Sequence, residues 1–234
     1  MEEHCPMPRD AAPRRWFLRC TIAVIALAAA AGTASAADDE IVPLNARFLI
    51  AARDGDVAAM TRMLGEGANV NSRNRLGESA LVIVLKKNRL DLAQSLIDRG
   101  ADVNLAAVNG ITPLMTAAYG GHAGMVTILL DKGAAPDARD RLQKTAMTYA
   151  AGEGHTAVVK VLLARGVDAN AVYEHGLTAL MWAAGYGRVD TMRALLDAGA
   201  RTDFKDDRGL TARDIASAQN EAKAVALLEL AQPK

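Results

Sequence analysis

Two sets of glycines recur along this chain at a fixed spacing of 33 residues, in constant phase over five periods. The first set is Gly67, Gly100, Gly133, Gly166 and Gly199. The second is Gly77, Gly110, Gly176 and Gly209, with Gln143 in the remaining place. Two residues after each place of the second set comes a hydroxyl residue: Ser79, Thr112, Thr145, Thr178 or Thr211. A period of this length predicts a supersecondary unit that buries its apolar face only by stacking on copies of itself.

The period that begins at Gly110 shows how one unit folds. Thr112 and Pro113 predict a helix start, because the hydroxyl accepts from free backbone N–H groups and proline fits the first helical position. Gly120 and Gly121 end that helix, and a more apolar helix around residues 125–130 ends at Gly133. Each unit is therefore expected to be a helix–turn–helix followed by an extended loop, in an all-α chain.

The pattern resembles the ankyrin repeat, whose signature is T-P-L-H-x-A at the first helix of a 33-residue unit. The resemblance covers almost everything after residue 44 and implies a solenoid of stacked helix–turn–helix units with extended loops. The matching segments are S-A-L-V-I-V (Ser79–Val84), T-P-L-M-T-A (Thr112–Ala117), T-A-M-T-Y-A (Thr145–Ala150), T-A-L-M-W-A (Thr178–Ala183) and T-A-R-D-I-A (Thr211–Ala216).

We expect an ankyrin-repeat domain over residues 45–231, in six units that end in a cap at each side. The approximate units are 45–73, 74–106, 107–139, 140–172, 173–205 and 206–231. A terminal repeat needs a polar outer face because nothing stacks beyond it. The last unit meets this need with Arg213, Asp214, Gln219, Asn220, Glu221 and Lys223.

The histidine of the ankyrin signature is missing from every unit. In the family it helps to tie the loops of neighbouring repeats together, so its loss predicts less rigid loops. Its places are taken by Val82, Met115, Thr148, Met181 and Asp214.

Residues 1–36 have the pattern of a signal peptide, and 37–44 of a short linker. Basic residues up to Arg19 precede an uncharged run from Cys20 to Ala37, which ends in A-S-A-A. This order predicts cleavage after Ala36, or as a second choice after Ala37. The alternative is a retained membrane anchor, for which the run is near the minimum length but mostly alanine.

The sequence is compatible with two export routes. Arg14 and Arg15, followed by Phe17, Leu18 and Arg19, resemble the bacterial twin-arginine motif. The general secretory route is the alternative, because arginine pairs also occur in ordinary signal peptides. Either route predicts a periplasmic or secreted bacterial protein with no stable membrane insertion after cleavage.

Composition narrows the classes of function. Cys5 and Cys20 are the only cysteines, and both would leave with the signal, so the mature chain would carry no disulfide. The whole chain has 27 basic and 27 acidic residues, and the signal removes similar numbers of each. Without a basic excess, nucleic-acid binding is not expected.

No catalytic, cofactor-binding or metal-binding constellation is expected. His122 and His155 lie one period apart in the same turn, which marks them as residues of the repeat, and His175 belongs to a surface loop. The chain has no G-x-S-x-G, H-E-x-x-H or P-loop motif. One hypothesis for Trp182 is an aromatic platform that binds a ligand. The same position in other repeats is occupied by Ile83, Tyr149 and Ile215, which favours core packing.

What remains is a surface for a partner. In the family, loop tips and exposed positions of the first helices line a concave face that holds other proteins. The alternative is that some of the apolar residues at these positions pack against the neighbouring loop and do not face a partner. The matching residues here are Arg75, Leu76, Lys86, Lys87, Ile111, Tyr119, Arg141, Leu142, Glu153, His175, Leu177 and Tyr186.

The sequence therefore predicts a monomeric, non-enzymatic scaffold that binds a protein partner after export and needs no cofactor. One alternative is an accessory or protective factor dedicated to a single periplasmic enzyme. A hydrolytic enzyme is the alternative from a different class, and no motif supports it.

Overall fold

The computed structural model describes residues 42–231, so the predicted signal peptide, its cleavage site at Ala36 and most of the linker lie outside the described residues. Twelve α-helices and one 3-10 helix occur in this range, with no β-strand among them. The first helices of the units are α2 (Leu44–Asp54), α4 (Ala80–Lys86), α6 (Pro113–Tyr119), α8 (Ala146–Glu153), α10 (Ala179–Gly185) and α12 (Ala212–Ala218). The second helices are α3 (Val57–Gly65), α5 (Leu90–Asp98), α7 (Ala123–Asp131), α9 (Thr156–Ala164), α11 (Val189–Asp197) and α13 (Ala222–Leu230).

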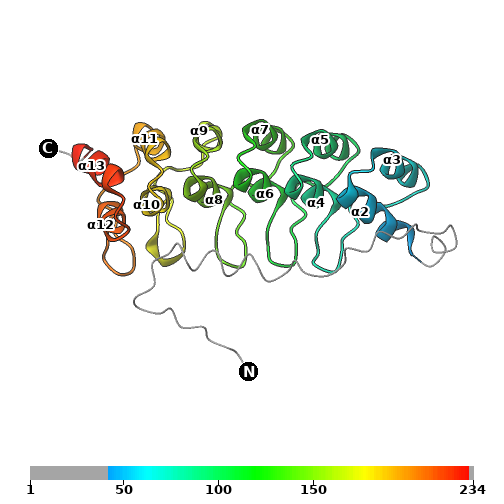
Figure 1. Ribbon diagram of the computed structural model, residues 1–234, viewed down its shortest axis with the longest axis horizontal. Coiled ribbons are helices and arrows are strands. Elements are labelled where there is room, and N and C mark those ends of the chain that lie inside the picture. The colour runs from blue at the N-terminus through cyan, green and yellow to red at the C-terminus, as the bar shows by residue number, and fades with distance from the viewer. Residues whose placement is uncertain (1–41, 232–234) are drawn as a thin grey trace, which may run out of the picture. The chain divides into compact units, whose positions relative to one another are not determined.

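The helices form six pairs that stand side by side in one row (Figure 1). Each first helix packs against its own second helix and against the first helix of the next pair. The expected all-helical repeat solenoid is therefore confirmed. One helix pair falls in each expected unit. The only difference is that α2 begins at Leu44, one residue before the expected start of the first unit.

The hydroxyl residues start five of the first helices, as predicted. The side chain at each N-cap accepts a hydrogen bond from the backbone N–H three residues later, at 3.2–3.4 Å. Capping supplies an acceptor to one of the backbone donors that a helix start leaves without a partner. Because these helices have only seven or eight residues, they depend on caps and packing more than on intrinsic propensity.

The first set of glycines ends the second helices. Gly100 has φ 86° and Gly133 has φ 85°, in the left-handed region that glycine adopts without a steric penalty. A Cβ at either position would meet nothing within 4 Å. Glycine is therefore required at these two positions by the left-handed backbone conformation, and not by a lack of space for a side chain.

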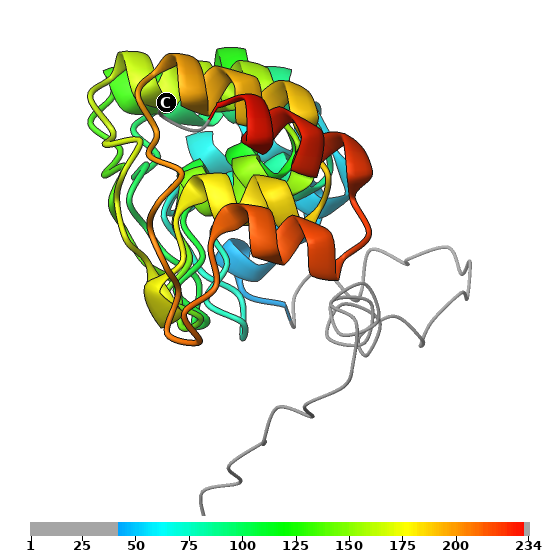
Figure 2. The ribbon, with the colours of Figure 1, turned by 90° about the vertical axis from the view of Figure 1, so that its left-hand side faces the viewer.

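The end-on view in Figure 2 shows the two layers of helices, and the buried hydrophobic residues of the core come from both layers. Alanine pairs such as Ala117 and Ala118 are fully buried and let neighbouring first helices approach closely. Leucines of the second helices fill the space behind them, and Leu129, Leu162 and Leu195 each have 0 % of their surface exposed. The core is continuous from the first pair to the last.

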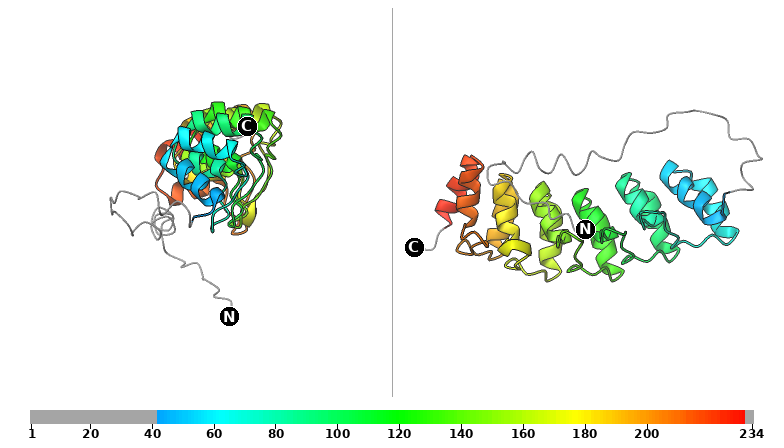
Figure 3. Two further views of the ribbon diagram at one scale, coloured as in Figure 1. Left: turned by 90° about the vertical axis from the view of Figure 1, so that its right-hand side faces the viewer. Right: turned by 90° about the horizontal axis from the view of Figure 1, so that it is seen from below.

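Extended hairpins join the units and hang below the first helices (Figures 1 and 3). We number them from one to five, as residues 71–79, 104–112, 137–145, 170–178 and 203–211. In each hairpin one backbone N–H donates to the carbonyl four residues later in the same register, such as Asn74 N–H to Glu78 O (3.0 Å) and Asp140 N–H to Lys144 O (3.0 Å). These hairpins carry the loop tips that the sequence analysis singled out.

Asparagine side chains at the start of three hairpins tie them to the turn that follows the next second helix, a role that the sequence analysis missed. Asn104 donates through Nδ2 to Gly133 O (2.9 Å) and accepts at Oδ1 from Ala135 N–H (2.9 Å). Equivalent pairs of bonds are made one and two periods away, by Asn71 and Asn170. The loops are thus held together although the signature histidine is missing.

Asp137 stands where the asparagine ladder would have its third member, and a carboxylate has no N–H to donate. We therefore expect Asp137→Asn to stabilise the fold by about 1 kcal/mol, and Asn104→Ala to destabilise it by about 1–3 kcal/mol, since each hydrogen bond contributes about 0.5–1.5 kcal/mol. Urea denaturation measures both changes. Asp137→Ala is the control for loss of charge alone, and an equal gain in that variant would contradict the explanation.

Candidate functional site

Most of the predicted partner-binding residues are accessible. Leu76 and Leu142 lie at hairpin tips with 59 % and 62 % of their surface exposed, and Tyr119 at the end of α6 is 51 % exposed. The charged members of the set, which are also exposed, are Arg75, Lys86, Lys87, Arg141, Glu153 and His175.

Three of the apolar candidates are less exposed than expected: Tyr186 is half-buried and stacks on Trp182, and two others pack against the core. Ile111 and Leu177 are half-buried and pack against the hydrophobic core. Both stand directly before the N-cap of a first helix, where the chain turns inward towards the helix layer. The alternative, that some of the apolar residues pack against the neighbouring loop, is correct for this pair only in that both are partly buried, because they pack against the core. The apolar line is therefore shorter than expected.

The basic end of the predicted surface lies at the C-terminus of α4. The Lys86 ammonium pairs with the Glu78 carboxylate, which also accepts from Asn74 Nδ2 (2.8 Å). Burial alone would raise the pKa of Glu78, but these hydrogen bonds bring that pKa below its ordinary value. Lys87 is exposed beside this pair, so the region keeps a positive rim.

Four aromatic side chains gather on the first helices of three successive units. We call Tyr119, Tyr149, Trp182 and Tyr186 the aromatic cluster. The Tyr119 and Tyr149 rings meet edge to face with centroids 5.9 Å apart, and the Trp182 and Tyr186 rings stack with centroids 6.4 Å apart. Such pairs are favourable beyond the area that they bury. The cluster is a packed group of rings of which Tyr119 is the most exposed member.

Lys144 joins the two halves of the aromatic cluster. Its Nζ lies 5.5 Å from the Tyr149 ring centroid and 4.8 Å from that of Trp182. At these distances the ammonium is attracted by the ring faces. Lys144 comes from the third hairpin, so the hairpin layer contributes a cation to the surface of the helix layer.

Tyr149 is fixed by a buried carboxylate. Its hydroxyl donates to Asp140 Oδ2 (2.5 Å), while Asp140 Oδ1 accepts from Leu142 N–H (2.8 Å) and Lys144 N–H (2.9 Å). Burial, followed by the bond to Asp140, raises the pKa of Tyr149. The phenol therefore stays neutral and holds its ring in one orientation.

A carboxylate, Glu153, and a guanidinium, Arg188, both lie near Tyr186 at the far end of the cluster. Burial and the nearby Glu153 carboxylate raise the pKa of Tyr186, whose ring covers Trp182. Trp182 itself is half-buried, so the expectation of a core position describes only one face of its ring. Tyr149 and Trp182 occupy the same slot 33 residues apart, and this repetition was the sequence signal for the cluster.

The histidines are mainly structural. His155 Nε2 lies 2.8 Å from Tyr119 O and so links two neighbouring turns, and Arg188 Nε donates to Gly152 O (2.9 Å) one period later. Burial and then the proximity of His155 lower the pKa of His122. His175 lies in a surface loop, as expected, 3.8 Å from carboxylate oxygens of Glu174 and Asp207.

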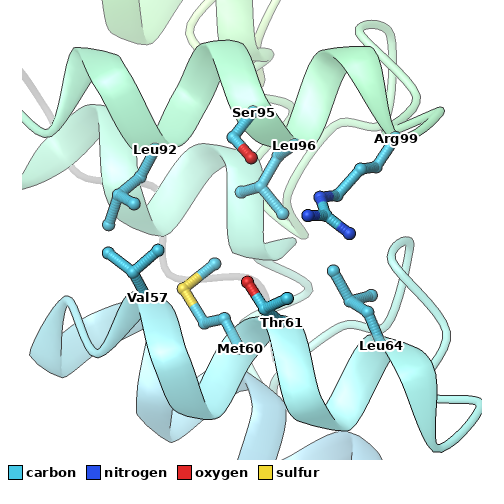
Figure 4. Close-up of a pocket in the computed structure, with 8 residues that line it drawn as sticks. All are labelled: Val57, Met60, Thr61, Leu64, Leu92, Ser95, Leu96 and Arg99. Carbon is cyan, nitrogen blue, oxygen red and sulfur yellow. The ribbon is translucent and has the colours of Figure 1, made fainter.

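A small crevice lies on the other layer, between α3 and α5. Side chains from the two helices, including Met60 and Leu96, face one another across it (Figure 4). Its volume of about 10 Å³ is close to what one water molecule needs, which is too little for a substrate. Within residues 42–231 there is no group of three side chains that could hold a metal ion. No helix in that same range is long and apolar enough to cross a membrane.

Comparison with known families agrees with the geometry. A family model described as ankyrin repeats (3 copies) matches residues 48–140, 82–173 and 147–232, which together span nearly all of the described chain. A search of curated proteins finds no match. Ankyrin repeats are generally protein–protein interaction modules and are typically non-enzymatic. The six stacked helix pairs, their caps and these matches lead to one conclusion: the chain belongs to the ankyrin-repeat family.

Proposed function

We propose that this protein is a non-enzymatic scaffold that acts after export and holds a protein partner on the face formed by its hairpins and first helices. This face is the concave one in the family. The observation that carries the proposal is the aromatic cluster with Lys144, because it spans three units and presents Tyr119 with half of its surface exposed.

The cluster has the composition of an interface centre. Tyrosine and tryptophan are enriched at the residues that dominate binding, and they lose little conformational entropy when a partner covers them. Here the rings are already held by their contacts with one another and by the bond from Tyr149 to Asp140. A partner would therefore meet a preformed surface.

Charged residues surround this centre on both sides. Arg141 and Lys87 are exposed on one side of the surface, and Glu153 lies beside Tyr186 on the other. Exposed charges at a rim mainly steer encounter and select the orientation of the partner. The proposed partner is a protein with an apolar contact patch and acidic groups opposite the basic residues.

Substitution of Tyr119 tests the proposed surface. After in vivo cross-linking has identified a partner, Tyr119→Ala is expected to weaken its binding by about 1–3 kcal/mol, mainly through faster dissociation, as for a residue at an interface centre. Lys86→Glu with Lys87→Glu is expected to slow association and reduce its dependence on salt. Surface plasmon resonance at two ionic strengths separates the two effects.

Val57→Ala is the matched control for that experiment. Val57 is also 51 % exposed but lies on α3 in the other helix layer. Its substitution is expected to leave binding unchanged. If the partner binds all the tyrosine and lysine variants normally and loses affinity for Val57→Ala, the proposed face is wrong.

Export is the second part of the proposal, and it rests on the sequence of residues 1–36. Replacing Arg14 and Arg15 by Lys is expected to leave uncleaved precursor in the cytoplasm if the twin-arginine route is used. Fractionation followed by immunoblotting measures this. Undiminished export of the double variant would identify the general secretory route, and a cytoplasmic wild-type protein would contradict export itself.

A further inference from the structure

Backbone hydrogen bonds join the tips of neighbouring hairpins at three of the four seams between them. Each runs from the N–H of one tip to the carbonyl of the tip before it. They connect Val108 to Leu76 (2.9 Å), Arg141 to Asn109 (2.9 Å) and Asp207 to His175 (3.0 Å). The equivalent bond between the third and fourth hairpins would run from Glu174 N–H to Leu142 O. Among the described residues this bond is not formed. The seam between the third and fourth hairpins thus differs from the others.

The second glycine set explains the difference. A Cβ on Gly77 would lie 2.8 Å from Val108 N, and one on Gly110 would lie 2.8 Å from Asp140 Cα. Real Cβ atoms essentially never approach backbone so closely, so the hairpins lie against each other only because these positions lack a side chain. The equivalent residue at the open seam is Gln143, with φ 53°. Its Cβ occupies the place that the next hairpin would need.

Further links across this seam also differ. Asp137, at the start of the third hairpin, cannot donate as Asn104 does to Gly133 O one period earlier. Arg73 crosses the first seam by donating to Ala106 O (2.6 Å), whereas its counterpart Arg139 lies with its guanidinium 5.9 Å from the Tyr173 ring centroid. Side-chain packing therefore takes the place of backbone bonds at the third seam.

The fourth hairpin is itself less braced than its neighbours. In the third, Asp140 accepts two backbone N–H groups of its own hairpin, and Asp206 does the same in the fifth. The fourth has Tyr173 in that slot, and its tip is a 3-10 turn at Glu174–Gly176. A tyrosine side chain cannot accept these two N–H groups, so this hairpin lacks the two bonds, although the Tyr173 ring itself is buried with 8 % of its surface exposed.

The helix layer continues across the same point. α8 packs against α10, and α9 packs against α11, as do the helices on either side. At this point the stack is therefore joined along its helices, while its hairpins are held by side-chain contacts of Tyr173 and have no tip-to-tip backbone bond. A layered structure that is joined more weakly at one edge is able to bend about the other edge.

We propose that the seam between residues 137–145 and 170–178 is a hinge, built by Gln143 and Asp137, at which the hairpin layer opens and closes while the helices stay packed. Lys144 of the third hairpin and Trp182 of α10 lie on opposite sides of it, so the opening changes the distance between the Lys144 ammonium and the Trp182 ring. The inference concerns the mechanics of the stack and does not depend on the identity, or the existence, of the proposed partner.

Distances between spin labels on hairpin tips test the hinge. In the full chain with Cys5→Ser and Cys20→Ser, labels are placed on Asn109→Cys and Glu174→Cys, which span the open seam. The control pair is Leu76→Cys and Arg141→Cys, the same two slots one period earlier, which span only bonded seams. Pulsed electron paramagnetic resonance is expected to give a broader distance distribution for the first pair.

Two further variants test whether the residue at position 143 is the cause of the broader distribution. Gln143→Gly is expected to narrow the first distribution to the width of the control pair. Gly110→Gln is expected to broaden the control distribution, with circular dichroism to confirm that the helices remain. Equal widths for the two pairs in the otherwise unchanged chain would overturn the hinge, and so would a Gln143→Gly distribution that stays as broad as before.

Discussion

Removal of the last unit, from Asp206 onward, is expected to lower the melting temperature by roughly 10 °C and to promote aggregation. The deletion uncovers the faces of α10 and α11, against which α12 and α13 pack. It also removes Leu228, which is 1 % exposed. Burial of one aliphatic side chain contributes about 1.5–3 kcal/mol, and each 1 kcal/mol shifts the melting temperature of a domain of this size by roughly 2–4 °C. Differential scanning calorimetry and light scattering measure the two effects.

The outer face of the last unit supplies the control for this deletion. Leu230 is 86 % exposed on α13, so Leu230→Ser is expected to leave the melting temperature unchanged. Arg213 and Glu229 pair at 2.7 Å between α12 and α13, as suits an end that faces solvent. A truncated chain as stable as the full one would mean that residues 206–231 do not act as the cap of the stack.

The fold was predictable because its determinants are local and repeat. A hydroxyl at the N-cap, a left-handed glycine after the second helix and alanines between first helices each act within one unit. Five copies in constant phase make any one of them recognisable even when another varies. Thr148 and Asp214 illustrate this tolerance, since each replaces the signature histidine and accepts a bond from the backbone N–H of its own N-cap residue (2.9 and 3.0 Å).

The candidate site was predicted less completely because it depends on contacts between units. The direction of a tip side chain is set by where the next hairpin lies, which the periodic pattern does not encode. Ile111 and Leu177 were placed on the surface for this reason, and the reach of Lys144 to the Trp182 ring was not foreseen. The hydrogen bonds of the asparagine ladder were not predicted for the same reason, since they connect residues 29 and 31 positions apart.

Departures from the repeat carried more information than agreement with it. Gln143 interrupts the second glycine set, and its effect on the seam follows from the close approach of backbone atoms to Gly77 and Gly110. Asp137 interrupts the asparagine series in the same way. A single substitution in one copy of a repeat thus changes one seam and leaves the others intact, since each unit contacts only its neighbours.

Leu162→Ala is expected to destabilise the fold by about 2–5 kcal/mol, the range for truncating a buried leucine. Leu162 lies on α9 in the middle of the stack with 0 % of its surface exposed. The cost includes the cavity as well as the lost burial, because the helices on both sides hold the site open. Urea denaturation followed by circular dichroism measures the change.

The next residue along the same helix provides the matched comparison. Leu163 is only half-buried and packs at the edge of the core, so Leu163→Ala is expected to cost about 1 kcal/mol, in proportion to the smaller area buried. Because α9 contacts both α7 and α11, the Leu162 cavity weakens two interfaces at once and is expected to reduce the cooperativity of unfolding. Equal destabilisation by the two variants would contradict the placement of the core between the helix layers.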